Sequence, residues 1–477
     1  MQQGRAWRVA AVAVLQAGCA GIAERPGGAE VEAAAPPVWR AAASAPATEA
    51  VATPAARNAW WQRFADASLA DLLAEARRGN TDLRGARAAL AAARAARESA
   101  SAALGPTVAV SGTAQRSRSA GHYANSFQTG FDASWELDVF GARRDAVDAA
   151  LAELEASVAS LADVRVSIEA EVALAYIDLR SAQARLAIAR DSLAAQQETL
   201  DIAGWRVQAG LATSIDVEQA RSAVEQTRAT LPVLHTAIGQ SISGLAALTG
   251  AAPASLGRAL EAFAPLPMPG AELAASLPAE TLRQRADVRA AERRVAAAAA
   301  RVQAADAARY PRFDLGGSLG LSALSLGALG ERSSVVGALL GSVAWPLVDQ
   351  GAALAALHAE QAGYESARAS YRAAVLVALK EVEDALTAIA EDRRRRESLA
   401  VAADAAANAA LLATQRYRSG LVDFLTVLDT QRTLLSLQDG LAIAEAAVVA
   451  DHVRLYKALG GGWEPDAAAR ADALARR

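Results

Sequence analysis

The chain has 477 residues, of which 53% are hydrophobic but only 5% aromatic, so alanine supplies much of the apolar content, as in long, closely packed helices. The formal net charge of -4 offers no basic surface for nucleic acid, and four histidines with one cysteine cannot build a Cys/His metal site or an internal disulfide. No uninterrupted run of 18 apolar residues follows the N-terminal segment, so a helical membrane span is not expected, although strands could still cross a bilayer.

The N-terminus has the pattern of a secretory signal peptide over residues 1–18, with two arginines before a short apolar run. The single cysteine, Cys19, follows it and resembles the site at which bacterial lipoproteins are cleaved and acylated, although Gln16 stands where an aliphatic residue is usual. Ordinary cleavage nearby, without lipidation, is the alternative. Residues 19–57 are rich in Ala, Pro, Gly and Glu and are expected to form an extended tether.

Residues 58–250 and residues 279–463 are predicted to be two copies of one unit. Each copy begins with a helical pattern that runs up to a proline, Pro106 in the first and Pro311 in the second, 205 residues later. Residues 251–278, rich in Pro, Gly and Ala, link the copies as an irregular segment, and residues 464–477 form a C-terminal tail.

After each proline the hydrophobic period changes from that of a helix to that of a strand. Between Ser126 and Asp138 apolar and polar residues alternate, and similar alternation predicts β-hairpins over residues 106–138 and 311–348. Each strand reaches the roughly ten residues that a tilted strand needs to cross a bilayer. A hairpin on a soluble sheet fits the alternation equally well.

A long helix is predicted from Gly141 to Gly210 and another from Gly351 to Gly420, because neither segment contains a proline. Each would be about 70 residues and on the order of 100 Å long. A helix of about 35 residues follows each one and ends near a glycine. The predicted fold is mainly α with membrane β, built from duplicated long helical hairpins and four strands per chain.

The turns between these helices share one plan, Gly210-Leu211 in the first copy and Gly420-Leu421 in the second, 210 residues apart. Glycine enters positive φ cheaply, so a helix can end there while the leucine folds back as the apolar contact of a C-cap. Asp423 can then cap the helix that follows.

Four strands cannot close a barrel, and open strand edges are not tolerated in lipid. Eight strands would give a filled barrel and twelve a barrel with an interior channel. A cyclic trimer is therefore the smallest assembly predicted to form an open pore.

Four motifs occur in order inside the duplicated frame: Trp135-Glu136-Leu137-Asp138-Val139-Phe140-Gly141, Tyr417-Arg418-Ser419-Gly420-Leu421, Leu425-Thr426-Val427-Leu428-Asp429-Thr430-Gln431-Arg432 and Leu455-Tyr456-Lys457-Ala458-Leu459-Gly460-Gly461-Gly462-Trp463. From about Trp60 to Trp463 the chain resembles the trimeric outer-membrane efflux factors, or TolC-like channels, and among them the OprM/NodT-type lipoprotein branch.

The resemblance implies an α-barrel and a trimeric 12-stranded β-barrel, lipid-anchored in the outer membrane of a Gram-negative bacterium and extending into the periplasm. It implies a passive homotrimeric conduit, with no enzyme activity and no cofactor or metal, that exports small molecules such as drugs, toxic compounds or metal ions. Its implied partners are outer-membrane lipid, a periplasmic adaptor (membrane fusion) protein and a proton-driven inner-membrane transporter.

The resemblance also implies positions for the functional residues. These are a periplasmic gate at Leu425 and Asp429 with Arg432 and Tyr417 as latch partners, and adaptor-contact tips at Gly210, Leu211, Gly420 and Leu421. One family aspartate falls on Thr426, so a doubled acidic ring is not expected. Three Asp429 carboxylates around a threefold axis would favour cationic cargo, whereas a solvated carboxylate early in a helix is the alternative.

Other interpretations stay open at this level. The same fold serves as the outer-membrane exit duct of type I protein-secretion systems. A periplasmic adaptor would have one hairpin flanked by small β domains, and the chain has no nucleophile elbow, P-loop or zinc signature of an enzyme. Trp135 and Trp345 could be interfacial anchors or core residues, and residues 393–396, all arginine, are interpreted as a solvated stripe.

Overall fold

The computed structural model describes residues 60–270 and 282–461. Cys19, the signal segment, the tether and the C-terminal tail lie outside the described residues. The described chain divides into a strand unit, residues 96–153 and 292–370, and a helical unit, residues 60–95, 154–270, 282–291 and 371–461.

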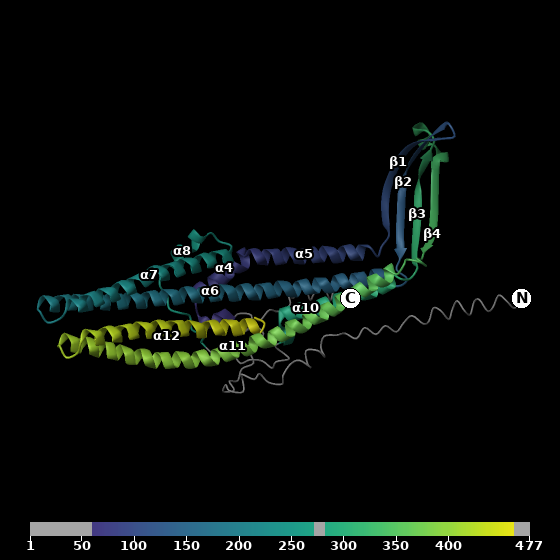
Figure 1. The fold of residues 1–477 in the computed structure, drawn as a ribbon. Helices are drawn as coiled ribbons and strands as arrows, with labels where there is room; N and C mark the ends of the chain where they lie inside the picture. The colour runs from purple at the N-terminus through teal and green to yellow at the C-terminus, as the bar shows by residue number, and fades with distance from the viewer. Residues whose placement is uncertain (1–59, 271–281, 462–477) are drawn as a thin grey trace, which may run out of the picture. The chain divides into compact units, whose positions relative to one another are not determined.

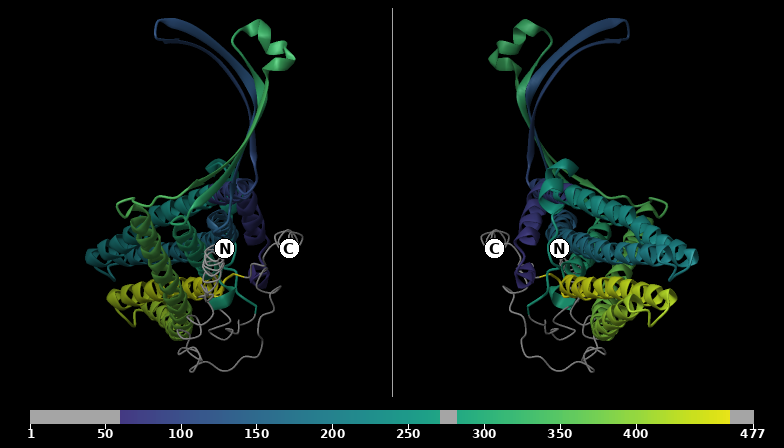
Figure 2. Two further views of the ribbon diagram at one scale, coloured as in Figure 1. Left: turned by 90° about the vertical axis from the view of Figure 1, so that its right-hand side faces the viewer. Right: turned by 90° about the vertical axis from the view of Figure 1, so that its left-hand side faces the viewer.

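The strand unit contains one four-stranded antiparallel sheet in the order β1-β2-β3-β4 (Figure 1). Its strands are β1 Thr107–Ser119, β2 His122–Leu137, β3 Arg312–Ala323 and β4 Val335–Ala344. The prediction of four strands per chain is confirmed. The two hairpins diverge toward their turns (Figure 2).

The two hairpins close differently. Ala120 and Gly121 join β1 to β2, and both have positive φ, 49° and 82°, as a two-residue turn that follows the strand twist requires. Strands β3 and β4 are joined through two short 3-10 helices, η4 Leu326–Gly330 and η5 Arg332–Ser334. Strand β4 ends at Ala344, earlier than alternation through Leu347 suggests, because Pro346 has no N–H for the ladder.

Across β1, β2 and β3 the register gives the sheet one apolar and one polar face, whereas β4 also places Val336 and Leu340 on the side of the polar residues. On the apolar face Phe131 lies between Val110 of β1 and Leu319 of β3. On the polar face Asp132 lies opposite Ser318 and accepts a hydrogen bond from the Ser111 hydroxyl at 2.6 Å. Since the apolar side chains are exposed in the single chain, this face needs an apolar surrounding.

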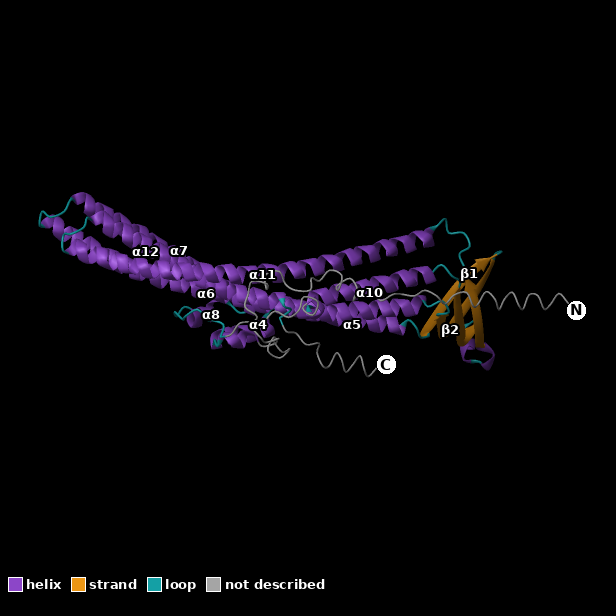
Figure 3. Cartoon of the chain, turned by 90° about the horizontal axis from the view of Figure 1, so that it is seen from below, coloured by secondary structure: helices purple, strands orange, loops and turns teal. Residues whose placement is uncertain are grey.

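Helices make up most of the described chain (Figure 3). They are α4 Ala67–Gly79, α5 Thr81–Ala102, α6 Ala142–Gln208, α7 Ser214–Thr249, α8 Pro253–Leu260, α10 Ala286–Ala307, α11 Ala352–Arg418 and α12 Phe424–Ala458, preceded by the 3-10 helix η3 Trp60–Phe64. Helices α6 and α11 have 67 residues each, which confirms the prediction of two long helices. The α6–α7 and α11–α12 hairpins turn at the same end of the helical unit (Figure 1).

The main core of the helical unit is formed by buried residues of η3, α4, α5, α6, α7, α8 and α12. Trp60 stacks on Tyr456 with ring centroids 5.1 Å apart. Asp66 caps α4 by accepting from the Leu69 N–H at 3.0 Å, and its second oxygen accepts from the buried Tyr176 hydroxyl at 2.8 Å. The sequence linker is partly helical, since Pro253 begins α8 at a position where no N–H is needed.

The end of α4 meets the end of α7 so closely that both residues at the contact must be glycine. A Cβ on Gly79 would lie 2.2 Å from the Thr249 carbonyl oxygen, and one on Gly250 would lie 2.2 Å from the Gly79 carbonyl oxygen. Asn80 fixes the same junction, because its side-chain amide donates to the Leu248 carbonyl oxygen at 2.8 Å.

Helices α7 and α12 are, by length and mean hydropathy alone, apolar enough to cross a membrane. The expectation of no such helix came from uninterrupted apolar runs, whereas the apolar stretches of these helices are interrupted by polar residues, which in α12 include Asp439 and Glu445. Both belong to the helical unit and pack within it, as Leu245 of α7 and Val449 and Val453 of α12 do in the main core. The same composition therefore also fits core helices.

Candidate functional site

The two hairpin turns of the helical unit end their first helix in the same way. Gly210 has φ 73° and Gly420 φ 74°. In each turn the glycine N–H donates to the carbonyl three residues back, and the following leucine N–H donates to the carbonyl five residues back, at 2.7 Å for Leu211 and 2.9 Å for Leu421. This is the Schellman C-cap, and the predicted Gly-Leu turns are present. Leu211 and Leu421 remain 68% and 74% exposed.

The second helix of each hairpin begins with a threonine and an aspartate three residues apart, but their order is reversed between the two turns. In the first turn Thr213 precedes α7, and its backbone N–H donates to Asp216 Oδ2 at 2.9 Å. In the second turn Asp423 precedes α12 and accepts from the Thr426 N–H at 2.9 Å and from the Thr426 hydroxyl. These hydrogen bonds from Thr426 lower the pKa of Asp423. Thr426 thus completes the cap at the start of α12.

An apolar cluster holds the two hairpins together next to their turns. Its buried members come from α6, α7, α11 and α12: Ala203, Ala220, Ala223, Ala413, Tyr417, Phe424, Val427 and Leu428. Tyr417 is only 3% exposed and contacts the edge of Phe424, with ring centroids 5.8 Å apart. Burial raises the pKa of the Tyr417 hydroxyl, which has no hydrogen-bond partner among the described residues.

Arg206 of α6 is the main polar link across this cluster. Its Nη1 donates to the Tyr417 carbonyl oxygen at 2.6 Å, and its guanidinium lies 4.7 Å from the centroid of the Tyr417 ring. A charged donor on a carbonyl and a cation over an aromatic face are both stabilising contacts. One residue of the first hairpin therefore holds the last turn of α11.

Three further polar contacts join the hairpins. Arg418 pairs with Glu198, the Gln431 amide donates to the Thr199 hydroxyl at 2.9 Å, and Arg185 binds both oxygens of Asp439 at 2.6 and 3.1 Å. Sequence reasoning missed all three contacts and Arg206. The duplication places Arg206 and Arg416 at equivalent positions, but it gives no signal that Arg206 meets Tyr417.

The predicted gate residues fall into two groups. Leu425 is 56% exposed on the first turn of α12, and Asp429 and Arg432 are exposed on its next turns. Within the described part of the chain neither charged residue has an ion pair or hydrogen bond. Tyr417 differs, because its side chain is buried inside the cluster and its backbone is bound by Arg206.

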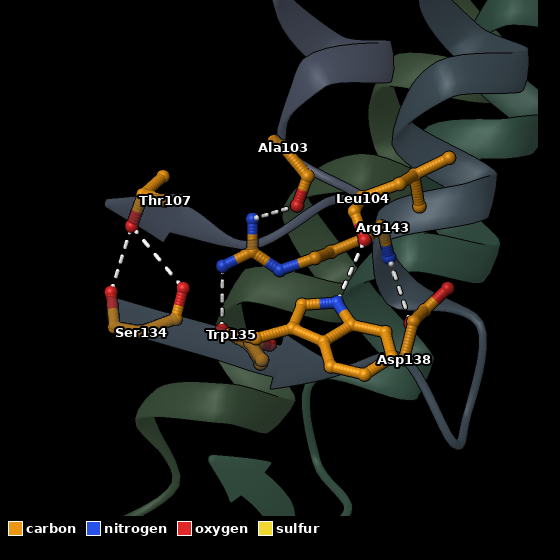
Figure 4. Close-up of polar contacts among 8 residues, drawn as sticks. Ala103, Leu104, Thr107, Ser134, Trp135, Asp138 and Arg143 are labelled. Carbon is orange, nitrogen blue, oxygen red and sulfur yellow. Dashed lines mark hydrogen bonds and ion pairs between the residues drawn. The ribbon is translucent and has the colours of Figure 1, made fainter. Parts of the chain in front are cut away.

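The junctions between helices and sheet lie in the strand unit and are tied by two equivalent tryptophans. The Trp135 indole donates to the Leu104 carbonyl oxygen at 2.9 Å (Figure 4), and Trp345 donates to the Arg309 carbonyl oxygen at 3.3 Å. Each indole therefore satisfies a carbonyl just beyond the end of the helix that precedes the sheet. Both rings are partly exposed rather than buried in a core.

Arg143 completes the first junction (Figure 4). Its guanidinium donates to the Ala103 carbonyl oxygen at 3.1 Å and to Glu136 at 2.6 Å, while its backbone N–H donates to Asp138 Oδ1 at 3.1 Å. The start of α6 is thereby fixed to β2.

Residues 60–270 and 282–461 contain no group of three or more His, Cys, Asp or Glu side chains that could hold a metal.

Comparison with known proteins covers almost the whole described chain. The family model described as "Outer membrane efflux protein" matches residues 72–251 and 277–461. The pyoverdine export outer membrane protein OpmQ of Pseudomonas putida is 34% identical over 91% of this chain and 94% of its own length. Nodulation protein T of Rhizobium leguminosarum bv. viciae is 32% identical over 85% of this chain and 84% of its own length.

The solved structure of the outer-membrane channel OprN superposes with a TM-score of 0.85 at 34% identity, covering 90% of this chain and 97% of OprN. The fold of the structural neighbours is that of trimeric TolC-like channels, in which four strands per chain contribute to one barrel. Homologues of the chain are outer-membrane efflux channels.

Proposed function

Because this chain belongs to the outer membrane efflux protein family of TolC-like channels, we propose that it is the outer-membrane conduit of a tripartite efflux system. Members of this family are channel proteins in the outer membrane. Three copies would form a passive tube with a periplasmic gate at the helix turns.

The single observation that carries the proposal is the open four-stranded sheet with one apolar face. Strands β1 and β4 each leave one edge without a partner strand among the described residues. Exposed apolar side chains on that face, such as Leu339 at 80% exposure, would be unstable in water but suit lipid. Twelve strands from three copies would pair every edge and leave an aqueous interior lined by the polar face.

The gate is proposed at the start of α12. Leu425 and Asp429 are exposed there, so in a trimer they could project into a narrow opening as apolar and acidic rings. Asp429 would favour cationic cargo, and Arg432, unpaired in the described chain, would have its partner in a neighbouring copy. Arg206 and Tyr417 would hold each pair of hairpins closed, and outward movement of α11 and α12 would break this contact.

The adaptor-contact tips are proposed at Gly210-Leu211 and Gly420-Leu421. Their leucines are the exposed apolar residues of otherwise capped turns, which suits docking by a periplasmic adaptor protein. An inner-membrane transporter, proton-driven in our proposal, would supply the energy, since the described chain contains no nucleotide-binding motif. Cys19 is proposed as the acylated residue that adds a lipid anchor.

The cargo is proposed to be small molecules. The name of OpmQ, a relative that matches nearly the whole chain, describes pyoverdine export, which supports a small-molecule cargo over a secreted protein.

To test this function, the protein is extracted with detergent from outer-membrane fractions, and its mass is measured by light scattering with correction for bound detergent. We expect a mass of three chains and conductance when the trimer is added to a planar bilayer. A monomer that leaves the membrane without detergent would contradict the shared barrel and the channel with it.

A further inference from the structure

The apolar face of the sheet changes character at the turn between β1 and β2. Along β1 the residues on this face are Val108, Val110, Gly112 and Ala114, followed by Arg116 and Arg118. Opposite Arg118 lies Tyr123. A face that is apolar along most of its length therefore ends in two cations and a phenol.

Both arginines lie against the ring of the tyrosine. The guanidinium carbon of Arg116 lies 4.7 Å from the centroid of the Tyr123 ring, and that of Arg118 lies 5.2 Å from it. Tyr123 is 61% exposed, and both arginines are exposed. The ring therefore holds two positive charges side by side at the surface, at the cost of their mutual repulsion.

No acidic side chain of the strands offsets this charge. Asp132, Glu136 and Asp314 all lie on the opposite, polar face of the sheet. Neither arginine forms an ion pair or a hydrogen bond within the part of the chain that the structure describes. Two adjacent guanidinium groups without an anion are suited to a ligand that carries phosphate.

The positions of Arg116, Arg118 and Tyr123 along their strands set the depth of these side chains in a bilayer. Trp135 lies beside the start of β1, where Thr107 pairs with Ser134, and it marks one end of the apolar band. Arg116 lies nine residues farther along β1, which at about 3.3 Å per residue and a tilt of about 40° is about 23 Å along the membrane normal. This is close to the height of about 25 Å of the apolar band on membrane barrels, so the arginines reach the far headgroup layer.

We infer that Arg116, Arg118 and Tyr123 form a binding site for the phosphate groups of an anionic lipid in the outer leaflet. This inference rests on the proposed membrane barrel. The outer end of the second hairpin carries Leu324 and Leu326, which are 77% and 70% exposed, and a single exposed arginine, Arg332, next to Glu331 in the chain. It therefore lacks a pair of arginines around one aromatic ring. Each chain would thus bind lipid phosphate at one hairpin only, and a trimer at three positions around its rim.

The test uses the full-length trimer in detergent, titrated with bis-phosphorylated lipid A, with a monophosphorylated lipid A and with phosphatidylcholine, and followed by native mass spectrometry. The test variant is Arg116→Gln/Arg118→Gln. The matched control is Arg221→Gln/Arg228→Gln on α7, which removes the same charge from exposed arginines of the helical unit.

We expect the trimer to bind bis-phosphorylated lipid A, monophosphorylated lipid A and phosphatidylcholine in decreasing order of affinity. The test variant should lose about 30-fold in affinity for the bis-phosphorylated lipid, about 2 kcal/mol at about 1.4 kcal/mol per tenfold, because each arginine near an anionic surface contributes about 1 kcal/mol. The control variant should bind as the wild type does. Arg116→Lys/Arg118→Lys should keep part of the affinity, because lysine keeps the charge but not the planar fork.

Equal affinity of the test variant and the wild type would overturn the inference. Displacement of the lipid by millimolar inorganic phosphate would overturn the assignment to lipid, because the site would then bind free phosphate. Conductance of the same preparations separates this inference from the proposed function. Variants that conduct normally but show no change in lipid binding refute the lipid site alone, whereas a wild type that neither inserts nor conducts refutes both.

Discussion

Arg206→Met should loosen the contact between the two helical hairpins. Methionine keeps most of the aliphatic length of arginine but removes the charged donor to the Tyr417 carbonyl oxygen and the cation over its ring. A hydrogen bond from a charged group contributes about 1.5–3 kcal/mol, and a cation–π contact about 0.5–1 kcal/mol at a partly exposed site. Since Arg206 Nε is buried without a partner, we take the lower end, about 2 kcal/mol.

A loss of about 2 kcal/mol from the closed arrangement alone shifts its equilibrium with an open one by about 30-fold. The measurement is open probability in single-channel recordings of the full-length trimer in planar bilayers, at fixed salt and voltage. Arg221→Met is the control, because Arg221 pairs with Glu218 inside its own helix. We expect a large rise in open probability for Arg206→Met and none for the control.

Two results would refute this reasoning. If Arg206→Met opens no more often than the wild type, the contact of Arg206 with Tyr417 does not limit opening. If Arg221→Met opens as often as Arg206→Met, the effect comes from loss of positive charge near the turns and not from this contact.

Three other predictions concern single side chains. Asp429→Ala should enlarge single-channel conductance or weaken block by cations, and unchanged conductance and block would remove Asp429 from the gate. Burial raises the pKa of Asp451 to about 6, above the 3.8 of an ordinary aspartate, so its ionised form opposes folding, and stability should fall as the pH rises from about 4 to above 6. Asp451→Asn should therefore melt at a higher temperature than the wild type at pH 8 but not at pH 4, and an equal gap at both pH values would contradict this sign. Cys19→Ser should leave a functional trimer that takes up no labelled fatty acid, and a wild type that takes up none would show that Cys19 is not acylated.

The elements of the fold were predictable because their signals are local. Period-2 alternation, long segments without proline and Gly-Leu turns indicated the strands, the long helices and the hairpins, and all three are present. The duplication helped, since each element of one copy supported its equivalent in the other. The early end of β4 was also visible in principle at Pro346, whose missing N–H outweighs alternation.

The contacts between the hairpins were not predictable in the same way. Helical periodicity shows which residues share a face, but it does not show which residue of another helix that face meets. The resemblance to TolC-like channels implies that Tyr417 is a latch partner of the gate, but the contact of Tyr417 with Arg206 is visible only in the structure. The alanine-rich surfaces add to this difficulty, because small side chains allow many alternative pairings of similar helices.

The two turns have the same backbone conformation, but Thr213 and Asp216 of the first turn are replaced by Asp423 and Thr426 in the second. The carboxylate therefore lies at a different position in each turn. In the first turn the negative charge is three residues inside the helix, and in the second it stands before the helix begins. In a trimer the six turns would therefore form a ring with sixfold backbone shape and threefold charge. A binding partner that contacts only the backbone of the turns could dock in six orientations. A partner whose cation pairs with the carboxylate of only one kind of turn could dock in only three.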